Sequence, residues 1–405
     1  MNSPNNDPLS RMSLSRRRLF ARAGMMGAAG MSLPAILAAC GGSSDGTSSS
    51  SSDASGSGSE APLGGGGNSL FFENWPEYID PTEDGLMGTV ERFMAASGVE
   101  MNYTETYNDN VEYFAKIQPL LGTGKPIDPD MIAPTSWLVG RLISLGWVDK
   151  LPVDLVPNAA NLRADLQKPA WDPTGEYSLP WQTGFAGIAY NIESTGRELK
   201  STEDLFDPAF SGKIGMLTEM RDTMGLLMLA DGVDISTVST FDAAANAFDR
   251  LEAAKNDGQI RRFTGNDYLN DLSTGNFAAC VGWSGDVVQL AVENPNIRFV
   301  IPEEGGTSWA DAMVMPKGAV NRDAAAKWMD FCYDPVQAAQ ITAWVQYVSP
   351  VAGVQAELEK IDPELAVNPL LFPDDATLAR TYSFANLDEG VEAEYDARFS
   401  AITGA

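Results

Sequence analysis

Apolar residues follow helical and strand spacing in turn along most of this chain. Apolar positions at intervals of three and four residues predict helices at 84–98, 110–121, 221–232, 239–255 and 321–344. The last of these patterns is broken at Pro335. Short apolar runs predict a first strand that begins at Ser69, a strand pair within 176–192, and strands at 99–107, 131–137, 213–220 and 276–286, the last opening onto a turn. This alternation predicts an α/β architecture with mostly parallel sheets.

The folded part of the chain is long. About 337 residues follow the start of the first strand, which is too many for one small core. The sequence therefore predicts two domains. Two segments, 176–192 and 297–319, are predicted to cross between them.

The first forty residues resemble an export signal rather than part of a domain. The segment "SRRRLF", at 15–20, resembles the twin-arginine motif, and a short apolar run follows it. That run ends in "LAAC", at 37–40, which resembles a bacterial lipobox, whose cysteine is acylated after cleavage. The alternative is a membrane-spanning helix, but the run is short for a span and contains several glycines. We therefore expect residues 1–40 to be a lipoprotein signal that ends at a lipidated Cys40.

Serine and glycine dominate residues 41–68, and no apolar pattern there could bury a core. We expect a flexible tether with a reach on the order of 30 Å. A twin-arginine signal implies that the protein is exported in folded form. Diacyl anchoring would then keep it at the membrane surface, outside the cytoplasm.

Acidic residues outnumber basic ones by 55 to 27, which gives a formal net charge of −28. Without the five arginines and one aspartate of residues 1–40, the remainder has 22 bases and 54 acids, a net charge of −32. Such a surface repels nucleic acid and attracts cations, so we expect no nucleic-acid partner. An acid excess that serves solubility or a saline habitat would give the same composition.

Histidine is absent from the sequence. Its absence excludes histidine-based triads and the usual catalytic zinc sites, and we expect neither a metal nor a cofactor. Cys280 lies in an apolar run and Cys332 in a helical one. Each is expected to be a buried small hydrophobic residue rather than a nucleophile or half of a disulfide.

Two large aromatic residues flank a carboxylate in "SLFFENWPEYID", at 69–80. Trp75, Glu77 and Tyr78 would be awkward neighbours in a core. Ligands, however, meet open α/β sheets at the C-terminal ends of strands. At that position the three side chains would form one wall of a cation site.

Six motifs carry a resemblance to a known family. They are "NWPEYI", "APTSW", "SLPWQTGFAGIAYN", "GWSGD", "EGGTSWADAMVMPKGA" and "YVSP", in this order. From Leu70 to its end the chain resembles the substrate-binding proteins of spermidine/putrescine ABC transporters. The resemblance implies an α/β, two-lobed periplasmic-binding-protein-like fold of type II, with two hinge crossovers and the ligand in the cleft.

The resemblance also implies how the lobes are built and used. Lobe one would take residues 69–185 and 310–357, and lobe two residues 186–309 and 358–405. Hinge closure around the ligand would produce the form that an ABC permease recognises. We expect the protein to act as a monomer.

Ten ligand-binding residues follow from the resemblance: Trp75, Glu77, Tyr78, Thr135, Trp137, Trp283, Asp286, Trp309, Asp311 and Tyr347. The set suits a polyamine, which is a flexible apolar rod that carries ammonium groups. Aromatic faces sandwich the methylenes and contribute about 0.5–2 kcal/mol of cation–π attraction per contact. The three carboxylates of the set would hold the ammonium groups by charge-assisted hydrogen bonds.

One departure from the family lies in a lobe-two helix. Where spermidine binders have two acids three residues apart, this chain has Met220 and Thr223. Glu219 and Asp222 are one position away, which turns them by about 100° around a helix, and Arg221 lies between them. A cation clamp is not expected from this offset. The ligand is then either shorter than spermidine, or its far end is neutral or anionic and meets Arg221 and helix N-terminal amides.

Three functions are compatible with these observations. The leading hypothesis is a lipid-anchored receptor, not an enzyme, that delivers putrescine or a related polyamine to a membrane permease. The second keeps the fold and changes the ligand to another small amine, an amino acid or an aminophosphonate whose anionic end meets Arg221. The third is an enzyme on this scaffold that uses Cys280 or Cys332 activated by a carboxylate, although neither cysteine lies in a motif matched to the cleft.

Overall fold

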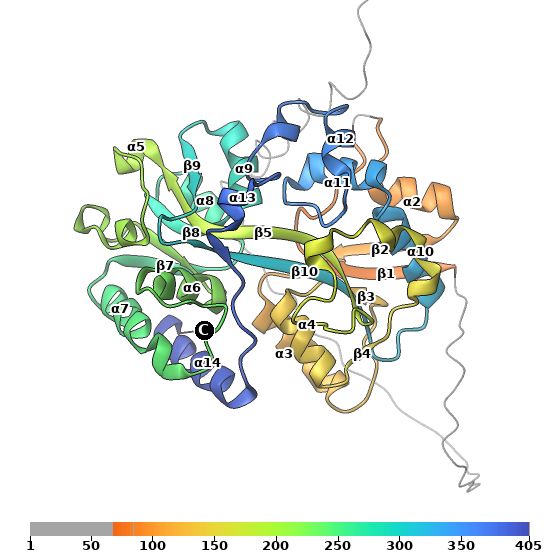
Figure 1. The fold of residues 1–405 in the computed structure, drawn as a ribbon, viewed down its shortest axis with the longest axis horizontal. Helices are drawn as coiled ribbons and strands as arrows, with labels where there is room; N and C mark the ends of the chain where they lie inside the picture. Colours follow the sequence, from red (N-terminus) through yellow and green to blue (C-terminus); the bar gives the residue numbers. More distant parts are fainter. Residues whose placement is uncertain (1–67, 84, 405) are drawn as a thin grey trace, which may run out of the picture. The chain divides into compact units, whose positions relative to one another are not determined.

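A mixed β-sheet joins segments that are far apart in the sequence (Figure 1). The computed structural model describes residues 68–83 and 85–404, which belong to one contact unit. The predicted signal with Cys40, and the predicted tether as far as residue 67, lie outside the described residues.

Eleven strands form the sheet of the described region, and eight follow one another in the order β2-β1-β3-β10-β5-β8-β6-β7. These eight are β1 Ser69–Asn74, β2 Glu100–Glu105, β3 Met131–Ile132, β5 Ser178–Asn191, β6 Ile214–Leu217, β7 Ile260–Thr264, β8 Ala279–Trp283 and β10 Gly306–Pro316. Three strands add to this path beside β10 or β5: β4 Val148–Asp149, β9 Ile297–Val300 and β11 Thr381–Tyr382.

β5 and β10 are the long strands at the centre of the sheet, and they pair antiparallel. Figure 1 shows them side by side, passing between two groups of helices. On the outer sides, β1 pairs in parallel with β2 and β3, and β6 with β7 and β8. The predicted parallel pairing therefore occurs within each half of the sheet, whereas β5 and β10, which cross between the halves, pair antiparallel. The predicted strand pair at 176–192 is wrong, because β5 is one strand of 14 residues, all of them buried.

Helices cover both halves of the sheet. They are α2 Thr89–Ser97, α3 Asn110–Leu121, α4 Ser136–Ser144, α5 Ile192–Thr195, α6 Met220–Ala230, α7 Ala245–Asn256, α8 Tyr268–Ser273, α9 Ser284–Glu293, α10 Arg322–Cys332, α11 Pro335–Val345, α12 Val354–Leu358, α13 Asp375–Leu378 and α14 Glu389–Thr403. Pro335 separates α10 from α11 and begins α11, where its missing N–H is tolerated. The turn predicted at the end of 276–286 is instead the start of α9.

Buried side chains form two main cores. The first contains Phe72 and Trp328, and the second contains Phe248 and Tyr395. β5 has its first buried residues in the first core and its last in the second. Two cores joined by long crossing strands make a two-lobed α/β fold, and the lobes are named here after these cores.

The chain also passes from the first core to the second near its C-terminus. Leu358, Leu365 and Leu371, which the resemblance places in lobe two, pack in the first core. Phe384 and Tyr395 pack in the second. A third crossing therefore lies between Leu371 and Phe384, while the predicted residue boundaries of the lobes stay predictions.

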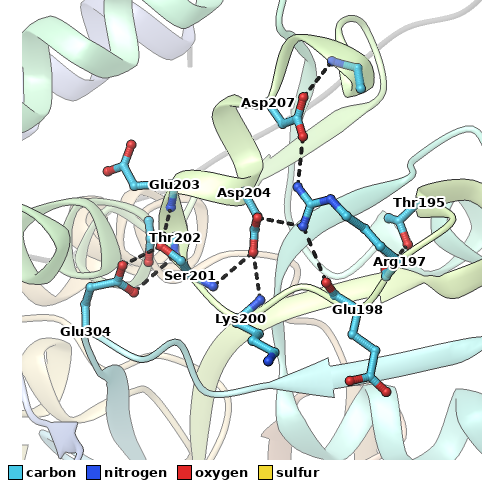
Figure 2. A network of polar contacts seen from close by, with 11 residues as sticks. Thr195, Arg197, Glu198, Lys200, Ser201, Thr202, Glu203, Asp204, Asp207 and Glu304 are labelled. Carbon is cyan, nitrogen blue, oxygen red and sulfur yellow. Dashed lines mark hydrogen bonds and ion pairs between the residues drawn. The ribbon is translucent and has the colours of Figure 1, made fainter.

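One surface segment of the second lobe is fixed largely by polar contacts (Figure 2). Arg197 donates to Asp204 and to Asp207, at 2.8 Å in each case. Asp204 also accepts hydrogen bonds from the backbone N–H groups of Lys200, at 2.7 Å, and Ser201, at 3.0 Å. These contacts hold the connection between α5 and β6 in place.

Candidate functional site

Alternate residues of β10 point to one face of the strand and reach different partners. Thr307 donates from its hydroxyl to Asp222 Oδ1 at 2.5 Å. The ring of Trp309 meets the ring of Tyr347 edge-on, with centroids 5.1 Å apart. Asp311, the next residue on this face, is only 3% exposed. One strand thus presents a hydroxyl, an indole and a carboxyl side by side.

Asp311 is held by two hydroxyl groups. Tyr78 donates to its Oδ2 at 2.8 Å, and Thr135 donates to its Oδ1 at 2.6 Å. Burial raises the pKa of Asp311 to about 7, although both hydrogen bonds act in the opposite direction. The Asp311 carboxyl is therefore buried. Among the described side chains, only these two hydroxyl groups donate hydrogen bonds to it.

Asp286, in the first turn of α9, has similar surroundings. Tyr347 donates to its Oδ1 at 2.7 Å, and Tyr268 donates to its Oδ2 at 3.1 Å. Burial raises the pKa of Asp286 to about 6. The rings of Tyr78 and Tyr347 have centroids 5.7 Å apart, so the surroundings of Asp286 and Asp311 adjoin.

Of the wall predicted after β1, namely Trp75, Glu77 and Tyr78, only Tyr78 is bonded to Asp311. Trp75 is 7% exposed and donates from its indole to the carbonyl of Ala133 at 2.8 Å, which places it in the first core. Glu77 has a φ of 59°, in the left-handed region that non-glycine residues rarely adopt. This turn lies directly before Tyr78, whose hydroxyl reaches Asp311.

The start of α6 brings two more carboxyl groups to the cluster. Glu219, the N-cap residue, accepts from the indole of Trp137 and the amide of Asn110, each at 3.3 Å. Asp222 accepts from the indole of Trp283 at 2.7 Å. Burial raises the pKa of Glu219 to about 8 and also raises the pKa of Asp222.

Arg221 lies between these two acids in the sequence. Its guanidinium carbon is 4.1 Å from the centroid of the Trp137 ring, which is a cation–π contact. It also forms an ion pair with Glu392, and the two side chains are only 11% and 14% exposed. The charge of Arg221 is therefore compensated within the protein.

A cavity of about 510 Å³ lies beside these groups. Of the ten predicted residues it is lined by Thr135, Trp137 and Trp309. The other seven predicted residues do not line it: Trp75, Glu77, Tyr78, Trp283, Asp286, Asp311 and Tyr347. Three of them contact lining residues directly: Trp283 contacts Asp222, Asp311 contacts Thr135, and Tyr347 contacts Trp309. Tyr78 contacts Asp311 instead.

Glu219 and Asp222 line the cavity, contrary to the expectation from the sequence. Met220 and Thr223 are instead buried, with 5% and 0% exposure, and Thr223 donates to the carbonyl of Leu217 at 2.8 Å. The interpretation that the one-position offset turns both acids away is therefore wrong. The signal for them was present, since two acids three residues apart share a helix face.

Other kinds of site find little support in the described structure. Across residues 68–83 and 85–404, no group of three or more acidic or cysteine side chains is arranged to hold a metal ion. In the same part of the chain, no helix has both the length and the apolarity to cross a bilayer. Cys280 and Cys332 are buried and not joined to each other, and burial raises the pKa of both thiols. Neither has the lowered pKa of a reactive thiolate.

Comparison with known families shows the general role of this chain. Residues 88–373 match the family described as bacterial extracellular solute-binding protein. The chain belongs to this family. This solute-binding protein therefore acts outside the cytoplasm and binds a solute rather than catalysing a reaction, as the sequence predicted, and its two-lobed α/β fold is confirmed.

Relatives of this solute-binding protein confirm the resemblance of the six motifs. The spermidine/putrescine-binding periplasmic protein of Escherichia coli K12 is 26% identical over 314 residues, which are 77% of this chain and 85% of that protein. The putrescine/cadaverine-binding protein of Pseudomonas aeruginosa PAO1 is 28% identical over 336 residues, covering 79% and 89%. A solved structure described as a putative spermidine/putrescine ABC transporter from Listeria monocytogenes has a TM-score of 0.72 at 25% identity, covering 83% and 98%.

Proposed function

We propose that this solute-binding protein captures a polyamine, such as putrescine or spermidine, between its two lobes and delivers it to an ABC transporter permease. One observation carries the proposal: Asp286 and Asp311 are buried carboxyls whose hydrogen-bond donors are hydroxyl groups. A buried carboxylate without a positive partner is costly. The ammonium groups of a ligand would turn both into charge-assisted hydrogen bonds.

The aromatic residues of the cluster supply a surface for the methylene chain. Ring contacts run from Tyr78 through Tyr347 to Trp309, so an aromatic row links the two acids. Such a row favours an apolar chain with cationic ends. The proposed site comprises the ten predicted residues together with Glu219 and Asp222, which extend the acidic wall into the cavity.

The relatives support the same ligand class. Two curated relatives that cover more than three quarters of this chain have spermidine, putrescine or cadaverine in their names. Their binding of these amines, and their place in ABC transport, are extended to this chain as part of the proposal.

The proposal also includes the way in which the protein is held at its site of action. A twin-arginine lipoprotein signal at 1–40, a lipidated Cys40 and a tether at 41–68 would keep a monomer close to the permease in the membrane. Lobe boundaries at 185/186 and 309/310 belong to the same proposal, and the last boundary is proposed at the third crossing, between Leu371 and Phe384, in place of 357/358.

Calorimetric titration with putrescine, cadaverine and spermidine tests the proposed ligand class. We expect saturable heat with at least one of them, together with an increase in the thermal unfolding temperature, because the ligand binds only the folded state. Absence of both signals with every amine at millimolar concentration would refute the proposal.

An amino acid or aminophosphonate is the second candidate, because Arg221 lines the cavity. Its guanidinium is paired with Glu392, however, and Glu219 and Asp222 line the same cavity, so the surroundings are net negative. This charge favours a cationic ligand over an anionic end. Arg221→Ala should abolish binding of a ligand with an anionic end, whereas a ligand without one keeps its affinity within a few-fold.

A further inference from the structure

Asn110, the first residue of α3, was not predicted to belong to the site, but it contacts two residues that line the cavity. Its side chain is buried, with 2% exposure. The amide nitrogen donates to Thr135 Oγ1 at 2.8 Å and to Glu219 Oε2 at 3.3 Å, and the amide oxygen accepts from the backbone N–H of Thr135 at 3.1 Å. Both N–H bonds and the oxygen of this side chain are therefore engaged.

These partners fix the orientation of the Asn110 amide. The backbone N–H of Thr135 can only donate, so it must face the amide oxygen. The amide nitrogen then faces the hydroxyl oxygen of Thr135 and the carboxyl of Glu219, which both accept. The opposite orientation would place one donor against another, and the amide oxygen against a carboxyl oxygen. One orientation of the amide is therefore strongly favoured.

Thr135 extends this arrangement to the buried carboxyl of Asp311. Its oxygen accepts from Asn110, and its hydroxyl donates to Asp311 Oδ1 at 2.6 Å. Because a hydroxyl has one proton and two lone pairs, the bond from Asn110 leaves the proton of Thr135 available for Asp311. Hydrogen bonds in such a chain also polarise one another. Asn110 thus helps to hold one oxygen of Asp311 from the first lobe.

The other N–H bond of Asn110 reaches the second lobe. Tyr113 and Ile117, on the same helix as Asn110, pack in the first core, whereas Glu219 caps α6, which packs in the second. The same carboxyl oxygen of Glu219 accepts from the indole of Trp137 at 3.3 Å, so two donors of the first lobe meet there. A bond between the lobes stabilises only the arrangement in which the lobes lie together.

We infer that Asn110 is a positioning residue that couples the carboxyl of Asp311 to the closure of the two lobes. Through Thr135 it orients Asp311, and through Glu219 it binds the opposite lobe. An ammonium group held by Asp311 and the closed arrangement of the lobes then favour the same orientation of one amide, so each stabilises the other. The inference rests on the proposed amine-binding function and adds to it a residue that retains the ligand without touching it.

Asn110→Asp separates this role from a simple effect of charge. The new side chain keeps the shape, can still accept from the N–H of Thr135 and suits the first turn of a helix, but it has no N–H to donate. An added acid beside a cation site would by itself strengthen the binding of an amine. If Asn110 couples Asp311 to closure, putrescine and spermidine should instead bind at least fivefold more weakly at pH 8, mainly through faster dissociation.

Asn102→Asp is the matched control, because it makes the same change at an exposed asparagine of β2, outside the cavity. It should leave both affinities within twofold of the wild type. Titration measures the affinities, and stopped-flow fluorescence measures the dissociation rates. Equal or tighter binding by Asn110→Asp would overturn the inference and leave the proposed function standing. Absence of amine binding by the wild type would refute the proposed function, and the inference with it.

A pair of neutral substitutions tests the path through Thr135. Asn110→Ala should weaken putrescine binding at least tenfold, and Thr135→Val about fivefold. Because both changes interrupt one chain of hydrogen bonds, the double variant should bind no more than about twofold more weakly than Asn110→Ala alone. Losses that multiply in the double variant would show that the two residues act independently, and would overturn the inference. Thermal unfolding of each ligand-free variant checks that a loss of affinity does not come from a loss of folding.

Discussion

The hydroxyl of Tyr78 donates to Asp311 Oδ2 at 2.8 Å across 233 residues of sequence. Tyr78 follows the first strand, and Asp311 lies on the strand that crosses back between the lobes. Because Asp311 also accepts from Thr135, three distant segments meet at one buried carboxyl. The geometry of the proposed site therefore depends on the packing of these three segments against one another.

Asp311→Asn should weaken the binding of putrescine about ten- to a hundredfold. The amide keeps the shape of the side chain, but it removes the negative charge that would pair with an ammonium group, and charge-assisted hydrogen bonds are about twice as strong as neutral ones. Titration of the wild type and the variant measures the effect. Asp257→Asn, at an exposed acid after α7, serves as the control and should leave binding unchanged. Equal affinities for Asp311→Asn and wild type would remove Asp311 from the ligand site.

Affinity for a cationic amine should fall as the pH is lowered from 8 to 5.5. Burial raises the pKa of Glu219 to about 8, of Asp311 to about 7 and of Asp286 to about 6. Protonation removes the charges that the ligand needs, so binding at pH 5.5 should be at least tenfold weaker than at pH 8. Titrations with putrescine at a constant ionic strength measure this. A pH-independent affinity would show that these carboxyls do not bind the ligand.

The stability of the ligand-free protein should change with pH in the opposite sense. An acid with a raised pKa in the folded state keeps its proton in a pH range where the unfolded chain has released it. Folding stability therefore falls as the pH rises from about 4, the ordinary carboxyl pKa, to between 6 and 8. The thermal unfolding temperature should be lower at pH 8 than at pH 5.5, and saturating putrescine should reduce this difference. A higher unfolding temperature at pH 8 without ligand would contradict the assignment.

Local patterns in the sequence predicted some elements closely. The helix expected at 110–121 is α3 with the same bounds, because Asp109 caps its start and apolar residues recur on its buried face. The segment 131–137 was less predictable, because its apolar start suggested a longer strand. In the structure β3 has two residues, and α4 already begins at Ser136.

The candidate site depends on contacts that no local pattern contains. The pairing of Asp286 with Tyr268 and Tyr347 joins α9, α8 and the segment that follows α11, and only the family resemblance pointed to Asp286 and Tyr347. Tyr268 was missed, because a tyrosine in a short helix carries no distinctive signal. Glu219 and Asp222 were not expected at the site, because they lie one position before the family's two acids, at 220 and 223. The spacing of the residues does not show that this shift still leaves both acids at the cavity.

Trp328→Ala should lower the free energy of unfolding by about 3–5 kcal/mol, because it leaves a large hole in a packed core. Trp328 is fully buried, and its ring lies 5.1 Å from that of Phe93 and 6.1 Å from that of Phe72, measured between centroids. Urea denaturation followed by circular dichroism measures the loss. Val367→Ala, at a side chain that is 75% exposed, is the control and should change the stability by less than about 0.5 kcal/mol. A loss below about 1 kcal/mol at Trp328 would mean that this core is not packed as described.

Thr218→Val should speed the release of ligand through its effect on closure. The hydroxyl of Thr218, beside the second core, donates to Asp109 Oδ2 at 2.9 Å, and Asp109 caps α3 beside the first core. Loss of this hydrogen bond removes about 1 kcal/mol from the closed arrangement, which corresponds to an affinity for putrescine about fivefold lower. Because neither residue lines the cavity, the change should appear in the dissociation rate measured by stopped-flow fluorescence. Thr237→Val, at an exposed threonine, is the control. An unchanged dissociation rate in Thr218→Val would show that this contact does not hold the lobes closed.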